Sequence, residues 1–259
     1  MNQSTKYDRI NKIYNILCII VTVIFILAMI LTVRLLPDIG SPDNPTNNEV
    51  SAKYISDASW ETGSLNAVSG MILDYRAFDT LGESCVLFVA TIAVFIMLRR
   101  DEDSSKHLPT KYMNHKFDPV GDPILQKTFG FIIPVIFLFG IYVIINGHLS
   151  PGGGFSGGAI FGAGLILYTN AFGLKKAERF ANSKTYLCSS IGALLFYALA
   201  KSYVFYIGPN HIESIIPVLA DGSIFASGLI LPLNIAVGIV VANTVFALYL
   251  MFRRGGFSK

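Results

Sequence analysis

Hydrophobic residues are gathered into six long runs along the chain, each close to the length of a membrane-spanning helix. The runs cover residues 13–33, 81–98, 128–146, 155–174, 186–207 and 228–252. A helix needs about 20 mainly apolar residues to cross a hydrocarbon core of about 30 Å. The pattern predicts an all-α, polytopic membrane protein with about six transmembrane helices.

The composition agrees with this prediction. The chain has 259 residues, of which 53% are hydrophobic and 14% are charged, whereas a soluble domain carries about 25% charged residues. The first run is longer than the 7–15 residues or so of a signal-peptide core, so we expect a retained span. The net charge of +3 is too small to indicate a nucleic-acid partner.

Basic residues are distributed asymmetrically between the segments that connect the runs. Sixteen Lys and Arg residues lie in the two tails and in the segments after the second and fourth runs. The opposite side has only Arg34, Lys53 and Arg76, and Lys201 lies within the fifth run. Because cytoplasmic loops carry the excess of Lys and Arg, both termini are predicted to be cytoplasmic.

A charged segment divides the chain into two predicted parts. Residues 99–123 are polar and contain three prolines, which is typical of a linker. We therefore predict a two-span unit at residues 1–110 and a four-span unit at residues 111–259.

An acidic motif, LDYRAFDTLGE, leads into the second run at residues 73–83. It contains Asp74, Arg76, Asp79 and Glu83. On a helix, residues three or four positions apart share a face, so the last three are predicted to form one polar stripe. One interpretation is an anchor pair of Arg76 and Asp79 near the headgroups. The other is that the carboxylates bind or relay H⁺ or Na⁺, because carboxylates at membrane depth are costly and usually functional.

The residues before this motif also have a helical pattern. Leu65, Val68, Met71 and Ile72 repeat at helical spacing. This pattern indicates an interfacial amphipathic helix that enters the membrane at the second run.

A glycine-rich motif, NGHLSPGGGFSGG, links the third and fourth runs at residues 146–158. Its candidate turn and packing residues are Gly147, Pro151, Gly152, Gly153, Gly154, Gly157 and Gly158, with Gly162 further along. Glycines spaced four apart present a smooth strip to which another helix can pack closely. His148 is predicted at the membrane boundary, as an interfacial hydrogen-bonding group or as a group that titrates near neutral pH.

Three polar residues lie inside the later runs. Lys201 is expected either to reach an interface or pair with a carboxylate, or to line a proton path. Asn234 and Asn243 are expected to make hydrogen bonds between helices. Cys18, Cys85 and Cys188 show no metal-ligand spacing, so we expect no cofactor in this chain.

The glycine-rich motif resembles the signature of the B subunit of Mrp-type (multiple resistance and pH) Na⁺/H⁺ antiporters, the MnhB-like domain. The segments at residues 223–229 and 233–238 are also similar to the last-span region of that family. The acidic motif resembles the C-terminal region of the large Mrp A protein, which is a separate small E-type subunit in membrane-bound hydrogenase complexes. The chain therefore looks like a fusion of two neighbouring subunits.

The resemblance implies a multi-pass subunit of a prokaryotic cell membrane that takes part in Na⁺/H⁺ exchange, with no activity for this subunit alone. It implies Mrp A-, C- and D-like and E-, F- and G-like partners, and hydrogenase-type peripheral subunits if the module is driven by redox chemistry. Na⁺ and H⁺ would be the transported ions, with Asp79 and Glu83 at acidic positions associated with ion transfer and His148 on the B-subunit signature. The alternative is a non-conducting subunit that holds larger channel subunits together.

Overall fold

The computed structural model describes residues 3–42, 44–98, 123–177, 183–208, 210 and 228–254. Its helices include six that are long and apolar enough to cross a membrane. These are α1 (Gln3–Arg34), α5 (Ala77–Met97), α7 (Pro123–Ile145), α8 (Gly154–Phe172), α10 (Ser183–Ile207) and α11 (Ile230–Arg254). The six predicted spans are confirmed, and the described residues contain no β-strand.

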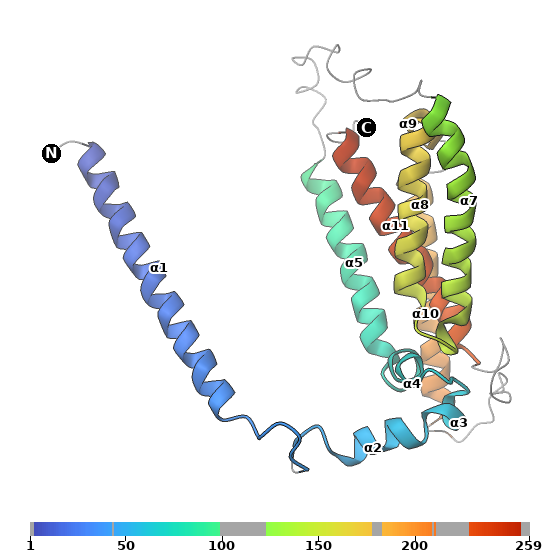
Figure 1. The fold of residues 1–259 in the computed structure, drawn as a ribbon, viewed down its shortest axis with the longest axis horizontal. Coiled ribbons are helices and arrows are strands. Elements are labelled where there is room, and N and C mark those ends of the chain that lie inside the picture. Colours follow the sequence, from blue (N-terminus) through green and yellow to red (C-terminus); the bar gives the residue numbers. More distant parts are fainter. Residues whose placement is uncertain are drawn as a thin grey trace. The chain divides into compact units, whose positions relative to one another are not determined.

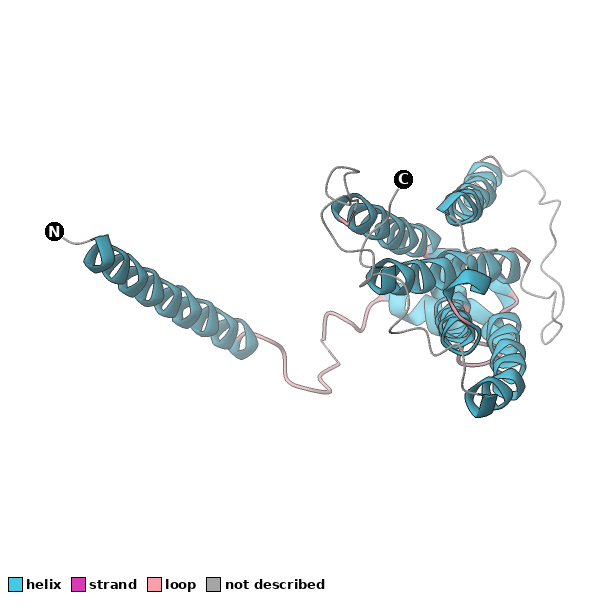
Figure 2. Ribbon diagram, turned by 90° about the horizontal axis from the view of Figure 1, so that it is seen from above, coloured by secondary structure: helices cyan, strands magenta, loops and turns pink. Residues whose placement is uncertain are grey.

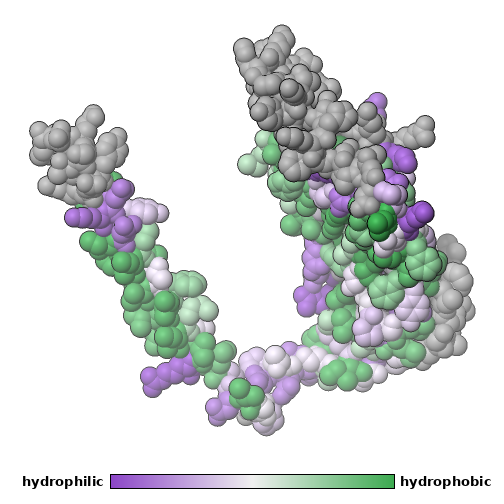
Figure 3. Space-filling model, turned by 45° about the horizontal axis from the view of Figure 1, so that its top comes forward, coloured by the Kyte–Doolittle hydropathy of each residue, from purple (hydrophilic) through white to green (hydrophobic). Residues whose placement is uncertain are grey.

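The chain consists of two compact units, residues Met1–Ala52 and Lys53–Lys259. The first unit contains α1, and α2 (Glu49–Ser56) crosses the division. The apolar side chains of α1 are exposed within this chain over residues 10–34. Figure 3 shows hydrophobic side chains along this helix and hydrophilic ones toward its ends. Lipid or other subunits must therefore cover it.

In the second unit, α11 is the central helix and packs against α8, α10, α5 and α7 (Figure 1). Seen from one end, the long helices of this unit form one bundle (Figure 2). Its largest buried cluster is apolar and includes Tyr197, Leu233, Val237 and Val240. The second span thus packs directly with the four-span part, and the predicted linker lies almost entirely outside the described residues.

The segment before α5 differs from the single amphipathic helix predicted from the sequence. It forms α3 (Ala58–Thr62), α4 (Ala67–Gly70) and a π-helical turn, η1 (Met71–Tyr75). Arg76 has φ −116° and ψ 35°, which ends the turn before α5 begins at Ala77. Leu65 lies outside any helix, and Leu65 and Val68 are exposed, whereas Leu73 is buried. The predicted interfacial helix is therefore interrupted, because Leu65 precedes α4 and the π-helical turn η1 directs Leu73 into the core.

Candidate functional site

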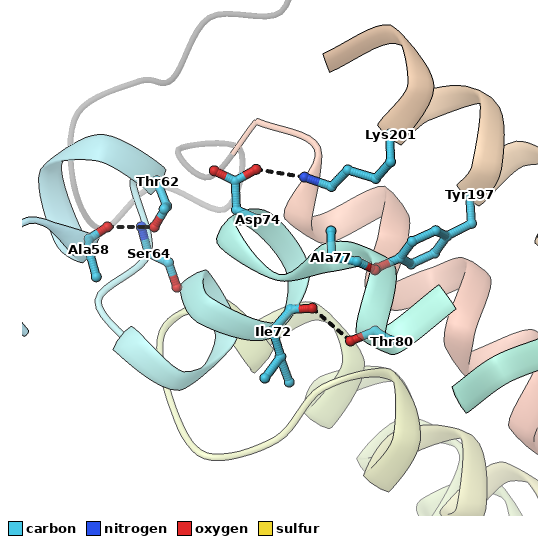
Figure 4. A network of polar contacts seen from close by, with 9 residues as sticks. All are labelled: Ala58, Thr62, Ser64, Ile72, Asp74, Ala77, Thr80, Tyr197 and Lys201. Atoms are coloured by element: carbon cyan, nitrogen blue, oxygen red, sulfur yellow. Dashed lines mark hydrogen bonds and ion pairs between the residues drawn. The ribbon is translucent and has the colours of Figure 1, made fainter. Parts of the chain in front are cut away.

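An ion pair between two elements is the main feature of the candidate site. Lys201 Nζ of α10 lies 2.6 Å from Asp74 Oδ1 of η1, and the two side chains point toward one another in Figure 4. The lysine side chain is 3% exposed and the aspartate side chain is 35% exposed. A buried ammonium needs such a partner, because an uncompensated charge in a low-dielectric region is costly.

The helix interruption positions Asp74 for this contact. The π-helical turn places Asp74 ahead of α5, and π-turns often occur at functional sites. Thr80 Oγ1 donates a hydrogen bond to the carbonyl oxygen of Ile72 at 2.7 Å. The Tyr197 hydroxyl of α10 donates to the carbonyl oxygen of Ala77 at 2.9 Å. The first bond joins the start of α5 to the turn, as Figure 4 shows, and the second joins the start of α5 to α10.

The other acidic candidates lie on the surface of this chain. Arg76 Nη2 contacts Asp79 Oδ2 at 2.5 Å, and both side chains are more than half exposed. Glu83 is also exposed, although it lies within the span α5. The structure therefore brings Asp74 to Lys201, and it leaves Asp79 and Glu83 facing lipid or other subunits.

A second polar cluster lies outside the spans. Lys53 Nζ lies 3.3 Å from Glu61 Oε1, and the Tyr75 hydroxyl donates a hydrogen bond to Glu61 Oε2. Burial raises the pKa of the Tyr75 phenol above its ordinary value, and the hydrogen bond and negative charge of Glu61 raise it further. Tyr75 therefore stays protonated and remains a donor at physiological pH. Tyr75 follows Asp74 directly, so this cluster also holds the turn that carries the ion pair.

The segment before α5 is bound to the glycine-rich loop. The loop includes η3 (Asn146–His148), and its carbonyl oxygens accept hydrogen bonds from three side chains of the earlier segment. Ser69 Oγ donates to Gly147 at 2.6 Å, Ser64 Oγ donates to His148 at 2.9 Å, and Asn66 Nδ2 donates to Gly147 at 3.1 Å. The imidazole of His148 is fully buried in this unit. The segment just before the acidic motif thus meets the glycine-rich motif at one end of the bundle.

The glycines of this loop allow a close turn between α7 and α8. Gly153 has φ +117°, a conformation that glycine adopts without strain. Its N–H donates to the carbonyl oxygen of Val143 at 3.1 Å. A Cβ on Gly152 would lie 2.9 Å from that same oxygen, and a Cβ on Gly147 would lie 2.7 Å from Cα of Gly153. Pro151 is exposed at the tip of the loop.

Helix α11 lies directly against the glycine strip of α8. A Cβ on Gly154 would lie 2.4 Å from the carbonyl oxygen of Asn234, and one on Gly158 would lie 2.6 Å from that of Gly238. A Cβ on Gly162 would lie 2.9 Å from Cβ of Val245. Gly157 faces α7 instead, where its Cβ would lie 2.3 Å from a side-chain carbon of Ile144.

The two asparagines of α11 make the expected bonds between helices. Asn234 Oδ1 accepts a hydrogen bond from the Gly154 N–H at 2.9 Å. Asn243 Nδ2 donates to Ser189 Oγ at 2.7 Å and to Ser190 Oγ at 3.1 Å. Within the described residues, no group of His, Cys, Asp and Glu has the arrangement of a metal site.

Sequence reasoning did not find that Asp74 pairs with Lys201 or that Tyr197 supports the turn. Asp74 and Lys201 are 127 positions apart, so no local spacing relates them. One signal in the sequence did point to the pair. An intramembrane lysine requires a carboxylate partner, and the chain has few carboxylates near its spans.

Comparison with known proteins identifies the family. The protein-family model described as "Domain related to MnhB subunit of Na+/H+ antiporter" matches residues 124–247. The family model for the E subunit of MBH, named MbhE, matches residues 40–112. An uncharacterized protein of Methanocaldococcus jannaschii is 32% identical over 204 residues, which cover 72% of this chain and 76% of that protein. The chain belongs to the MnhB family. It also carries an MbhE-type segment, which contains the acidic motif.

Other MnhB relatives are longer or match over a smaller region. A protein of Rhizobium meliloti, named as the probable A/B subunit of a K⁺/H⁺ antiporter, is 28% identical over 166 residues, 58% of this chain but 17% of that protein. A protein of Staphylococcus epidermidis, named as the putative antiporter component mnhB2, is 32% identical over 85 residues, 33% of this chain and 60% of that protein.

Two solved membrane complexes contain chains with the same fold. A chain of the membrane-bound sulfane sulfur reductase, an archaeal respiratory membrane complex, has a TM-score of 0.67 and 26% identity. The match covers 91% of this chain and 97% of that chain. A chain of the Mrp complex from Dietzia has a TM-score of 0.63 and 24% identity, and the match covers 99% of this chain and 26% of that one. This MnhB-family chain is thus a membrane subunit related to Mrp antiporters and to membrane-bound respiratory complexes.

Proposed function

We propose that this chain contributes to cation and proton translocation in an antiporter module of the Na⁺/H⁺ type that is built from several subunits. The observation that supports this proposal most strongly is the pair of Asp74 and Lys201. A structural bundle gains little from burying an ammonium group, because apolar residues of similar volume are often at least as stabilising. A buried charge within a membrane span is therefore a functional hypothesis by default.

The pair gives a physical means of coupling ion movement to a second charge. A proton or a cation that arrives at the Asp74 carboxylate competes with Lys201 for the same oxygens. Once the carboxylate is neutralised, the lysine charge has lost its partner in a low-dielectric region, where an unpaired charge is costly. Asp74 is the more exposed member of the pair, so it is the one that ions reach first.

Asp79 and Glu83 have a different part in this proposal. Both are exposed on this chain, and Glu83 lies inside a span, where contact with lipid would be costly. We place them against neighbouring subunits, where their carboxylates attract cations. The partners would be other antiporter subunits, with peripheral redox subunits if the module belongs to a respiratory complex. Na⁺ and H⁺ are the proposed ions, and a prokaryotic cell membrane is the proposed location.

The test of the function is the replacement of Lys201 by methionine in the intact complex. Methionine keeps the long apolar stem but removes the charge, so we expect assembly to continue and Na⁺-dependent dissipation of ΔpH in inverted vesicles to be lost. Lys184→Met is the matched control, because Lys184 lies at the other end of α10 and is exposed. Wild-type exchange by Lys201→Met would reject a role for this pair in transport.

The exposed carboxylates give a separate prediction. Asp79→Asn and Glu83→Gln complexes should assemble but dissipate ΔpH more slowly, because each loses a charge that attracts cations. Measurement with Na⁺ and with K⁺ would show which cation depends on them. Normal rates in both variants with both cations would remove these two residues from the ion path.

The second candidate function is that of a non-conducting assembly subunit. The close packing of α8 on α11 through glycines favours it, since such contacts are typical of helix association in membranes. In that case Lys201→Met, Asp79→Asn and Glu83→Gln would all leave transport unchanged.

A further inference from the structure

The residues of α5 that are fully buried in this unit are small or hydroxyl-bearing. The fully buried residues of this span are Ala77, Thr80, Ser84 and Thr91. Intervals of four and seven residues place the three hydroxyls on one side of the helix. The large apolar side chains Val86 and Val89 are exposed. The span therefore directs its hydroxyls inward, between partly buried apolar side chains such as Leu87 and Phe88 that pack on the same core.

Helix α10 directs a matching face toward α5. Its buried polar residues are Tyr186, Ser190, Tyr197 and Lys201. The two helices run in opposite directions, since Lys201 meets Asp74 before the start of α5 while Tyr186 packs beside Phe95 near its end. The 15 residues from Tyr186 to Lys201 correspond to about 22 Å of helix. That is most of a hydrocarbon core of about 30 Å.

The hydroxyls of the two helices lie opposite one another along this length. The Tyr197 hydroxyl lies beside that of Thr80, and the Tyr186 hydroxyl lies beside those of Thr91 and Thr244. Thr244 belongs to α11, which also donates from Asn243 to Ser190. We call this set the hydroxyl seam. It consists of Thr80, Ser84, Thr91, Tyr186, Ser190, Tyr197 and Thr244, and it begins at the ion pair of Asp74 and Lys201.

Three members of the hydroxyl seam make no hydrogen bond of ordinary geometry within the protein, although the hydroxyls of Tyr186 and Thr244 lie close to one another. The three are Ser84 Oγ, Tyr186 Oη and Thr244 Oγ1, and their residues are between 1% and 7% exposed. Hydroxyls in helices can instead bond to the carbonyl four residues earlier, as Thr91 and Thr169 do. An unpaired buried hydroxyl costs about 1–3 kcal/mol, and buried water is the usual partner of such groups. Within the described residues, these three are the buried hydroxyls that make no hydrogen bond of ordinary geometry, and all lie on the seam.

We propose that the hydroxyl seam binds a file of water molecules and conducts protons between the Asp74–Lys201 pair and the opposite end of the bundle. Each hydroxyl or water accepts a proton from one neighbour and donates its own to the next, so one proton enters and one leaves without a change in any residue. The hydroxyls of α5, α10 and α11 lie at successive depths and supply both donors and acceptors. This proposal rests on the proposed function, because the ion pair is the end of the path.

The test removes single hydroxyls while keeping side-chain volume. Tyr186→Phe and Thr244→Val in the intact complex should fold normally, since each removes an unpaired buried group. We expect each to slow Na⁺-dependent dissipation of ΔpH roughly tenfold, the equivalent of one lost hydrogen bond in the path. Thr169→Val is the control, because Thr169 is fully buried in α8 and bonds to the carbonyl of Leu165.

Two further measurements separate this proposal from the proposed function. Exchange of labelled Na⁺ for Na⁺ moves no proton, so Tyr186→Phe should retain it while losing proton-coupled exchange. Experimental maps of the wild-type complex that resolve water should show ordered water between Ser84 and Tyr186.

If wild-type vesicles exchange Na⁺ for H⁺ and Tyr186→Phe and Thr244→Val do so at the same rate, the seam is a packing surface and the proposal is wrong. If the wild type shows no exchange at all, the proposed function is wrong. Absence of ordered water in the maps would then show that the hydroxyl seam is not a water path either.

Discussion

Replacing Asp74 with asparagine is expected to destabilise the unit and abolish transport. The substitution leaves the ammonium of Lys201, which is 3% exposed, without its carboxylate. Loss of one partner of a buried ion pair costs about 3–5 kcal/mol, and we expect about 3 kcal/mol because Asp74 itself is partly exposed. Thermal unfolding of the purified complex, monitored through the release of this chain, would measure the loss of stability.

A matched variant distinguishes the pair from a general effect of lost charge. Asp79→Asn removes a carboxylate five residues away whose partner Arg76 is exposed, and exposed pairs contribute only about 0–1 kcal/mol. We therefore expect its unfolding temperature to match that of the wild type. Equal stability of Asp74→Asn and the wild type would show that Lys201 has another partner in the assembled complex.

Replacing Gly158 with leucine is expected to prevent α8 from packing on α11. Even a Cβ atom there would lie 2.6 Å from the carbonyl oxygen of Gly238 and 2.9 Å from Cβ of Val241. Backbone atoms cannot move aside as a flexible side chain can, so the two helices must separate. Because α11 is the central helix of the unit, we expect purification in mild detergent to recover little or no assembled complex.

Gly192→Leu is the control for this substitution. Gly192 lies in the span α10, and no atom lies within 4 Å of the Cβ it would gain. The same leucine there should leave the folded unit intact. Normal recovery of the Gly158→Leu complex would contradict the close approach of α8 and α11.

The spans were predictable because hydrophobicity is a local property of the sequence. Each long apolar run became one helix, and the spacing of Gly154, Gly158 and Gly162 indicated a close helix contact. The sequence did not show which helix would make that contact. Helix α8 packs on α11 because their shapes are complementary over many residues, and no single sequence motif encodes that complementarity.

The candidate site was predictable only in part. Asp74, Lys201 and His148 were recognised as unusual polar groups near spans, but the pairing of the first two follows from the tertiary fold. The break at Arg76 was not predictable from helical spacing, since the residues around it also fit a continuous helix. That break determines which carboxylate belongs to the candidate site. It separates Asp74, which pairs with Lys201 of α10, from Asp79 and Glu83 on the surface.

In the proposed function, the pair of Asp74 and Lys201 serves transport rather than folding alone. The double variant Asp74→Asn with Lys201→Met removes both charges, and replacing both members of a buried pair is often close to neutral for stability. We predict that its complex assembles and unfolds like the wild type but shows no Na⁺-dependent dissipation of ΔpH in inverted vesicles. Wild-type rates of dissipation in vesicles containing this double variant would show that the pair does not serve transport.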